Sequence, residues 1–204
     1  SNNCSTNTDT IIITEPAAIT VSSSTTNVSC NGGNDGTAIL TLNGGSGILT
    51  ENWGGNNPLN LAAGTYIYTV TDTSLCVESG SVTITEPTIL TSSISGTNLL
   101  CFNDNTGTIN LTVNGGTSPY TFAWTGPGGP YNTEDLSGLA AGSYIVLVTD
   151  TKGCTTTEAI TITEPTTSLS SIISPNHLTS CLITNGSVDL TVIGGTLPYT
   201  YLWN

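Results

Sequence analysis

The feature that most constrains this chain is a repeat with a period of about 70 to 80 residues. The tripeptide Thr-Glu-Pro occurs at residues 14–16, 85–87 and 163–165. Between successive copies the same landmarks return in the same order: a cysteine, Asp or Asn with Gly, Gly-Gly, a tryptophan, Leu-x-x-Gly-x-Tyr, Thr-Asp and a second cysteine. A period of this length indicates an array of like domains. Such an array is suited to spanning distance or presenting copies, and not to assembling one catalytic pocket.

The repeat predicts the domain organisation of the chain. Residues 17–87 and 88–165 form two complete repeats, residues 1–16 are the C-terminal strand of a preceding repeat, and residues 166–204 are the N-terminal half of a following one. We therefore expect the chain to be a segment of a longer protein, so missing terminal signals carry no meaning.

The charge balance excludes whole classes of partner. Only 7% of the residues are charged, against about 25% in typical proteins, and one basic residue stands against 14 acidic ones. A chain with a net charge of −13 cannot neutralise phosphates. This excludes nucleic acid and an acidic membrane surface as partners, and we expect no membrane insertion in this segment. Thr, Ser, Asn and Gly supply the polar surface instead, which is typical of a secreted surface protein.

Apolar residues alternate with period two, which predicts half-buried β-strands. The alternating runs lie at residues 38–42, 109–113 and 188–192, at 120–124 and 199–203, at 66–70 and 144–148, and at 82–84 and 160–162. No stretch keeps a helical period. Strands every 8–12 residues, separated by Gly, Asn or Pro, predict an all-β sandwich of about seven strands in each repeat.

Two details favour an immunoglobulin-like topology. A lone tryptophan (Trp53, Trp124 and Trp203) stands where such folds bury a core Trp on strand C, and Tyr66 and Tyr144 follow a Gly turn as in a tyrosine corner. These positions favour core packing over a sugar-binding platform. Glu51 does not fit, because a buried unpaired carboxylate is costly, so strand C of the first repeat is expected to bend or lie at an edge. We predict tandem immunoglobulin-like sandwiches, stacked end to end and stabilised by disulfides.

The six cysteines recur at two fixed positions, early in the repeat (Cys30, Cys101, Cys181) and late in it (Cys4, Cys76, Cys154). This pattern predicts disulfides in an oxidising compartment. Zinc is disfavoured, because there is no Cys-x-x-Cys and His177 is the single histidine.

The predicted topology also bears on which cysteines pair. Within-repeat pairs (Cys30–Cys76, Cys101–Cys154) would have to join opposite ends of a sandwich, about 17–20 Å apart, whereas a disulfide needs Cα atoms within about 7 Å. A bond between neighbouring repeats, Cys30–Cys154, is therefore favoured over Cys30–Cys76. Cys76 and Cys101 would then pair with repeats outside the chain or only partly within it. Because no Gly/Ser linker follows Glu-Pro, the array is expected to be stiff.

Several segments together resemble the SprB-type repeats found in giant surface proteins of the Bacteroidota. They are residues 30–38 (CNGGNDGTA), 115–124 (GGTSPYTFAW), 141–144 (AGSY) and 150–154 (DTKGC). The similarity covers the whole chain, although the first repeat lacks Pro-Tyr before its Trp and the second has Cys101-Phe102-Asn103 for the usual Cys-x-Gly. The resemblance implies export to the cell surface by the type IX system and a role in adhesion. The best-known member is an adhesin moved by the gliding motor.

Other candidate sites are weaker. No catalytic or cofactor-binding constellation repeats, and His177 is expected to be a surface residue, so we expect no enzyme. Calcium between repeats is an alternative for Asp35, Glu86 and Asp150, against ordinary roles in turns and strand ends. Possible glycosylation motifs are the sequons at Asn3, Asn27, Asn110 and Asn185, together with Asp9-Thr10-Ile11.

The functional prediction is a structural or adhesive segment of a long extracellular filament, acting as a rigid stalk on the cell surface. The alternative is that the repeats themselves bind surface glycans or proteins. The expected partners are neighbouring repeats of the same chain. Surface glycans and other copies of the filament are further candidates.

Overall fold

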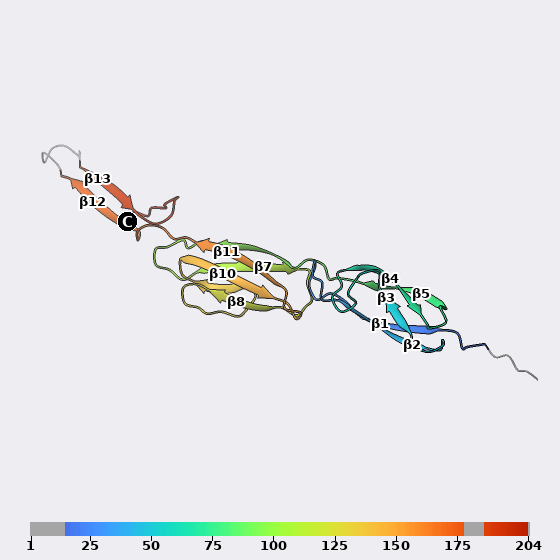
Figure 1. Ribbon diagram of the computed structural model, residues 1–204. Coiled ribbons are helices and arrows are strands. Elements are labelled where there is room, and N and C mark those ends of the chain that lie inside the picture. The colour runs from blue at the N-terminus through green and yellow to red at the C-terminus, as the bar shows by residue number, and fades with distance from the viewer. Residues whose placement is uncertain (1–14, 178–185, 204) are drawn as a thin grey trace, which may run out of the picture. The chain divides into compact units, whose positions relative to one another are not determined.

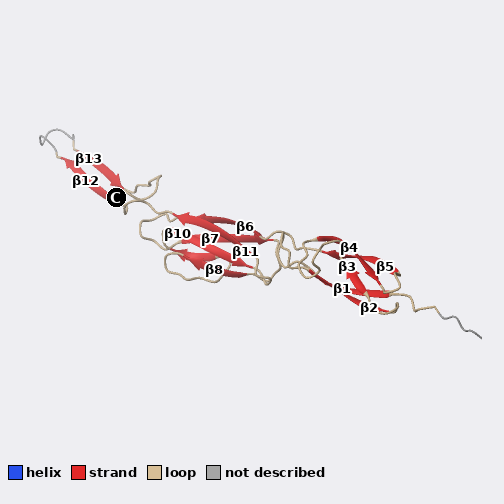
Figure 2. Cartoon of the chain, in the orientation of Figure 1, coloured by secondary structure: helices blue, strands red, loops and turns tan. Residues whose placement is uncertain are grey.

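The computed structural model describes residues 15–177 and 186–203, and every regular element in these ranges is a β-strand (Figure 2). The chain divides into two compact units, Ser1–Glu86 (unit 1) and Pro87–Asn204 (unit 2), with the boundary inside the second Thr-Glu-Pro. The further division at residue 165 stays a prediction. Residues 1–14 of the strand predicted at 1–16, and the predictions for Cys4, Cys181, Asn3, Asn185 and Asp9-Thr10-Ile11, lie outside the described residues.

Unit 1 consists of two small antiparallel sheets (Figure 1). Its strands are β1 (Thr20–Thr26), β2 (Thr37–Asn43), β3 (Thr50–Asn52), β4 (Gly64–Thr71) and β5 (Val77–Ile84). One sheet pairs β1 with β2, and the other has the order β3-β4-β5. Buried side chains from both sheets, among them Leu40 of β2 and Val70 of β4, join in one hydrophobic core. The two sheets therefore form two layers around that core.

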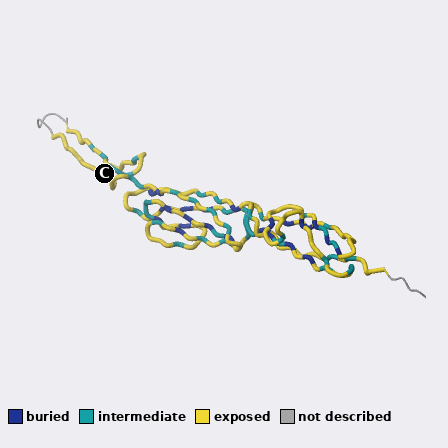
Figure 3. The backbone as a smooth tube through the Cα atoms, in the orientation of Figure 1, coloured by how far each residue is buried: buried dark blue, intermediate teal, exposed yellow. Residues whose placement is uncertain are grey.

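Unit 2 repeats this arrangement and adds a hairpin. Its strands are β6 (Thr91–Thr97), β7 (Gly107–Asn114), β8 (Thr121–Thr125), β9 (Leu136–Leu139), β10 (Gly142–Thr149), β11 (Thr155–Ile162), β12 (Ser170–Asn176) and β13 (Ser187–Ile193). The sheets have the orders β6-β7-β9 and β8-β10-β11, and β12 pairs with β13. Buried positions alternate with exposed ones along the strands, as the sequence pattern predicts (Figure 3).

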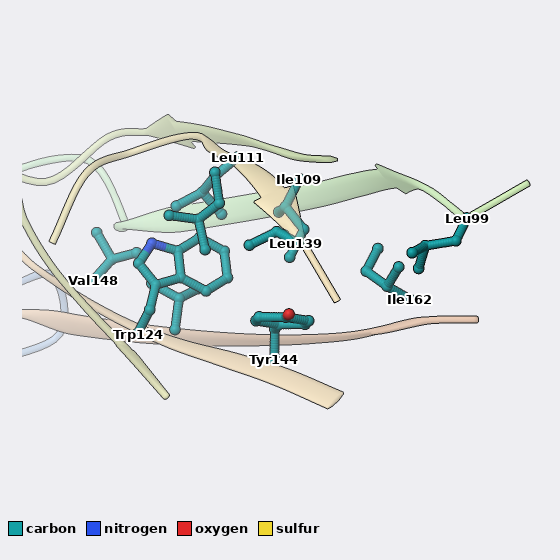
Figure 4. Close-up of a cluster of buried hydrophobic side chains, with 10 residues drawn as sticks. Leu99, Ile109, Leu111, Trp124, Leu139, Tyr144, Val148 and Ile162 are labelled. Atoms are coloured by element: carbon teal, nitrogen blue, oxygen red, sulfur yellow. The ribbon is translucent and has the colours of Figure 1, made fainter. Parts of the chain in front are cut away.

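The aromatic residues confirm the predicted core positions. Trp124 is 1% exposed and Tyr144 fully buried, and both lie in the core of unit 2 (Figure 4). The Trp124 indole Nε1 donates to the carbonyl oxygen of Thr133 at 2.8 Å. The Tyr144 hydroxyl donates to the carbonyl oxygen of Ala140 at 2.9 Å, and Tyr66 bonds Ala62 in the same way at 3.1 Å. The tyrosine-corner prediction is therefore confirmed in both complete repeats.

The predicted seven strands are wrong for the part of the chain that the structure describes. The first complete repeat has five strands (β1–β5) and the second has six (β6–β11). The segment after each tryptophan forms turns, with hydrogen bonds from Asn56 N to Trp53 O and from Gly129 N to Gly126 O. Where the second repeat has β9, the first has only the isolated bridge between Gly36 and Leu61. The repeat is therefore a smaller all-β domain than a seven-strand immunoglobulin-like sandwich.

Glu51 lies at a sheet edge, as its sequence predicts. It belongs to β3, an edge strand of only three residues, and its side chain is exposed. Its Oε2 accepts a hydrogen bond from the indole Nε1 of Trp53 at 3.0 Å. The carboxylate thus has a partner and avoids the cost of burial.

Two local predictions near the C-terminus are wrong. Residues 199–203 form no strand, and Trp203 is 62% exposed where Trp124 is 1% exposed. In the second repeat the corresponding strand, β8, is held by hydrogen bonds to β10. Among residues 186–203 no strand is found that could pair with residues 199–203 as β10 pairs with β8.

Candidate functional site in the cysteine-bearing loops

The four described cysteines lie in two kinds of loop. The early loops, residues 27–36 and 98–106, connect β1 to β2 and β6 to β7 and carry Cys30 and Cys101. The late loops, residues 72–76 and 150–154, connect β4 to β5 and β10 to β11 and carry Cys76 and Cys154. Because these loops recur in both units, their geometry can be compared within one chain.

The Thr-Glu-Pro segment fastens the early loop of unit 1. Val28 N donates to the carbonyl oxygen of Thr85, and Thr85 N donates to Oδ1 of Asn27, both at 3.0 Å. Gly32 N, two residues after Cys30, donates to Oε2 of Glu86 at 2.6 Å. The glutamate of the tripeptide therefore holds the cysteine loop through a charge-assisted hydrogen bond.

Unit 2 uses the same contacts with a different loop sequence. Leu99 N donates to the carbonyl oxygen of Thr163, Thr163 N donates to Oδ1 of Asn98, and Asn103 N donates to Oε2 of Glu164. Asn103 takes the place of Gly32, and the two have φ of 59° and 74°. Asn tolerates this left-handed conformation better than most residues do. The departure of the second repeat from Cys-x-Gly therefore leaves the loop geometry intact.

A buried aspartate organises each late loop. Asp150, only 5% exposed, accepts hydrogen bonds at Oδ1 from Lys152 N (2.8 Å) and Cys154 N (2.9 Å) and at Oδ2 from Thr117 N (2.8 Å). Asp72, 4% exposed, accepts the equivalent bonds from the backbone N–H groups of residues 46, 74 and 76. Burial on its own raises the pKa of both carboxyl groups, but the backbone donors outweigh it and the net pKa is lowered. Both aspartates therefore act as charged acceptors that shape the loop.

The late loop of unit 1 contains an unfavourable backbone position. Leu75 has φ of 66° and is 81% exposed, whereas the equivalent residue of unit 2 is Gly153, with φ of 86°. A left-handed conformation costs a residue with a Cβ about 1–2 kcal/mol. Leu75→Gly is expected to recover about 1 kcal/mol, less the entropy cost of glycine, and raise the melting temperature of unit 1 by a few degrees. The substitution Gly153→Leu should lower the melting temperature of unit 2. Thermal unfolding measures both changes, and a loss of stability on Leu75→Gly would contradict the claim that Leu75 is strained.

The geometry rules out the within-repeat disulfides. Cys76 lies just before β5, while the early loop with Cys30 is bonded to residues 85 and 86, just after β5. The eight residues of β5 separate the two loops by roughly 27 Å at about 3.4 Å per residue, and β11 separates the loops of unit 2 in the same way. Cys30 and Cys154 are disulfide-bonded, whereas Cys76 and Cys101 are free and exposed. The sequence argument against Cys30–Cys76 and Cys101–Cys154 is confirmed.

The three carboxylates considered for calcium serve the loops. Asp35 Oδ1 accepts a hydrogen bond from Ser29 N at 2.9 Å, so Asp35 and Glu86 both bind the early loop of unit 1. Asp150 accepts from the three backbone donors given above. No group of three or more His, Cys, Asp or Glu side chains that could hold a metal ion occurs in residues 15–177 and 186–203. Each of the three carboxylates thus has a turn or strand-end role within its own unit.

The other candidate residues take ordinary positions. His177 follows β12 and is exposed, and Asn110 is exposed on β7. Asn27, which we considered as a sequon, caps residue 85 through its side-chain oxygen. Neither this role nor that of Asp72 was predicted from the sequence, although both residues recur in the second repeat, as Asn98 and Asp150. Within the described ranges no helix is long and apolar enough to cross a membrane.

Comparison with known proteins supports the repeat assignment. The SprB repeat family model matches three segments of the chain, residues 22–50, 93–129 and 179–204. The first two matches include the early loops, so SprB repeats are present at the positions where Cys30 and Cys101 lie. The chain is also similar to a decoration protein of Escherichia phage T5, with 41% identity over 66 residues, or 27% of this chain. It spans 40% of the length of that relative.

Proposed function

We propose that this chain is a structural segment of a long cell-surface protein, in which tandem SprB repeats form a rigid stalk. The observation that carries the proposal is the fastening of each early loop to the end of its own repeat by Glu86 or Glu164. A loop held in this way presents its cysteine at the end of the domain where the next repeat begins. The oxidised cysteines Cys30 and Cys154 and the SprB matches point to an extracytoplasmic protein.

The proposed stalk is stiffened by a disulfide between repeats, Cys30–Cys154. Both residues are oxidised, and their within-repeat alternatives Cys76 and Cys101 are free thiols. In a longer array each of the free thiols would make the equivalent bond to a further repeat. This pairing would remove hinge freedom at each Thr-Glu-Pro joint.

The finer assignment follows the SprB resemblance. We propose that the full protein is an adhesin of the gliding-motility type in a member of the Bacteroidota, exported by the type IX system. The similarity to a phage protein named as a decoration protein agrees with a structural role on a surface. The absence of a recurring catalytic constellation supports a non-enzymatic role, and the stalk would need no cofactor.

Small-angle X-ray scattering of the whole chain, oxidised and then reduced, tests the stalk. We expect one well-defined distance distribution when oxidised and a broader one after reduction, because the joint gains freedom. A chain with Cys76→Ser and Cys101→Ser keeps the oxidised pair and should match the wild type. An oxidised chain already as flexible as the reduced one would overturn the rigid stalk. Adhesion of beads coated with the oxidised chain would instead assign glycan or protein binding to the repeats themselves.

A further inference from the structure

The outward surface of one sheet in unit 2 is free of ionisable side chains. We call this surface the hydroxyl face; it consists of Thr121, Ala123 and Thr125 of β8, Ser143, Ile145, Leu147 and Thr149 of β10, and Thr155, Thr157, Ala159 and Thr161 of β11. All of these side chains are exposed except that of Thr149, which is half-buried. The outward surface of the other sheet of unit 2 is neutral as well, with Thr91, Ser93, Ser95 and Thr97 of β6 and Thr108, Asn110, Thr112 and Asn114 of β7. The hydroxyl face differs from that surface in the side chains at its centre.

The centre of the hydroxyl face is apolar. Ile145 and Leu147 are 47% and 43% exposed on the middle strand. Ile145 lies opposite Thr125 and Ala159, and Leu147 opposite Ala123 and Thr157. Two large aliphatic side chains, surrounded by methyl and hydroxyl groups, thus form an exposed apolar centre that a second sheet could cover.

The carboxylates of Glu158 and Asp150, on and beside this sheet, point away from the hydroxyl face. Glu158 of β11 faces the inner side, where its Oε1 accepts a hydrogen bond from the Ser92 hydroxyl at 3.1 Å. Asp150 is buried in the late loop. Charge is therefore kept off the face by the strand register, and not only by the low charge content of the chain.

Unit 1 has an equivalent face on its β3-β4-β5 sheet. Its outward residues are Thr50 and Asn52 of β3, Thr65, Ile67, Thr69 and Thr71 of β4, and Val77, Ser79, Ser81 and Thr83 of β5. None is ionisable, and Ile67 is 69% exposed at the centre of the middle strand. The same combination of aliphatic centre and hydroxyl surround therefore occurs in both units.

We propose that the hydroxyl face is a lateral contact surface for a second copy of this chain. Two copies of a strongly anionic chain repel each other wherever charged surfaces meet, and this face meets itself without like charges. Threonine and serine hydroxyls both donate and accept hydrogen bonds, so the face is also self-complementary in a two-fold contact. A neutral polysaccharide is the less favoured occupant, because the outward face carries no aromatic side chain on which a sugar ring could stack.

The area of the face predicts a weak contact. Three strands about 4.8 Å apart and up to eight residues long cover roughly 400 Å², about half of the ~800 Å² per partner that a stable complex buries. One pair of faces should therefore bind with a dissociation constant of roughly 100 μM or weaker, and many repeats side by side would bind by avidity. This inference does not depend on the stalk or on its disulfides.

Sedimentation equilibrium of the whole oxidised chain with Cys76→Ser and Cys101→Ser tests the contact, because these substitutions remove the free thiols that could form mixed disulfides. We expect concentration-dependent dimerisation that strengthens as NaCl rises from about 0.05 to 0.5 M, because salt screens the net charge. Ile145→Glu with Leu147→Glu should weaken dimerisation at least tenfold at 0.5 M NaCl.

The matched control is Asn110→Glu with Thr112→Glu, which adds the same charge to the exposed side of β7 on the other sheet. It should change dimerisation less than threefold at 0.5 M NaCl. A chain that stays monomeric at every salt and protein concentration would overturn the proposal. So would equal weakening by both variants, or a monomeric chain retained by an insoluble neutral polysaccharide through Ile145 and Leu147.

Discussion

Asp150→Ala is expected to lower the free energy of unfolding of residues 87–204 by about 2–4 kcal/mol. The carboxylate is 5% exposed and accepts three backbone hydrogen bonds, from Thr117, Lys152 and Cys154. Alanine would leave these N–H groups without their acceptor in a region that water reaches poorly. Urea denaturation followed by tryptophan fluorescence would measure the loss, because Trp124 reports on this core. Glu134→Ala removes an exposed carboxylate of the same unit and should change stability by less than about 0.5 kcal/mol.

The charge of Asp150 adds a pH signature to this prediction. Asp150→Asn keeps an oxygen for Lys152 N and Cys154 N but turns a donor toward Thr117 N, so it should be less stable than wild type at pH 7. The pKa of Asp150 is lowered in the folded chain, because the backbone donors outweigh the upward effect of burial. Its contribution is therefore present above the unfolded pKa of about 3.9 and is lost as the pH falls through the lower folded pKa. The stability gap between wild type and Asp150→Asn should narrow below about pH 4; a gap independent of pH would contradict the charged-acceptor role.

The alternation of apolar residues was sufficient to place most strands. Leu111 and Val146 point into the core because successive side chains of a strand face opposite sides, and this rule is local. The tyrosine corner was equally readable, since Ala140 and Tyr144 are four residues apart. Strand number was harder to predict, because whether a segment after the tryptophan becomes a strand or a turn depends on a partner. Leu61 makes a single bridge where Leu136–Leu139 make a strand.

The loop contacts could not be derived from the pattern alone. Glu86 in Thr-Glu-Pro fits the end of a strand as well as it fits an acceptor for Gly32 N, which is 54 residues away in sequence. Polar residues are common in loops because their side chains hydrogen-bond to nearby backbone groups of the same turn, so a polar residue there does not point to a distant partner. Asn27 was likewise read as a sequon and is a cap for residue 85. Only the fold brings these distant partners together.

Reduction of the Cys30–Cys154 bond that we propose is expected to destabilise the chain by about 4–5 kcal/mol, because a bond between these residues closes a loop of more than 100 residues in the unfolded chain. Denaturation with and without reductant would measure the effect. Cys76→Ser with Cys101→Ser removes the two free thiols and should leave the stability of the oxidised chain unchanged. Non-reducing peptide mapping should recover Cys30 linked to Cys154.

A double-mutant cycle decides whether the two oxidised cysteines share one bond. If they do, Cys30→Ser, Cys154→Ser and the double variant lose the same free energy, because the first substitution already breaks the bond and the second has nothing left to remove. If each cysteine bonds a different partner, such as Cys4 or Cys181, the two losses add and the double variant is about twice as destabilised. Additive losses would refute a disulfide between Cys30 and Cys154. Equal losses would mean that the bond broken by reductant joins two neighbouring repeats and does not lie within one repeat.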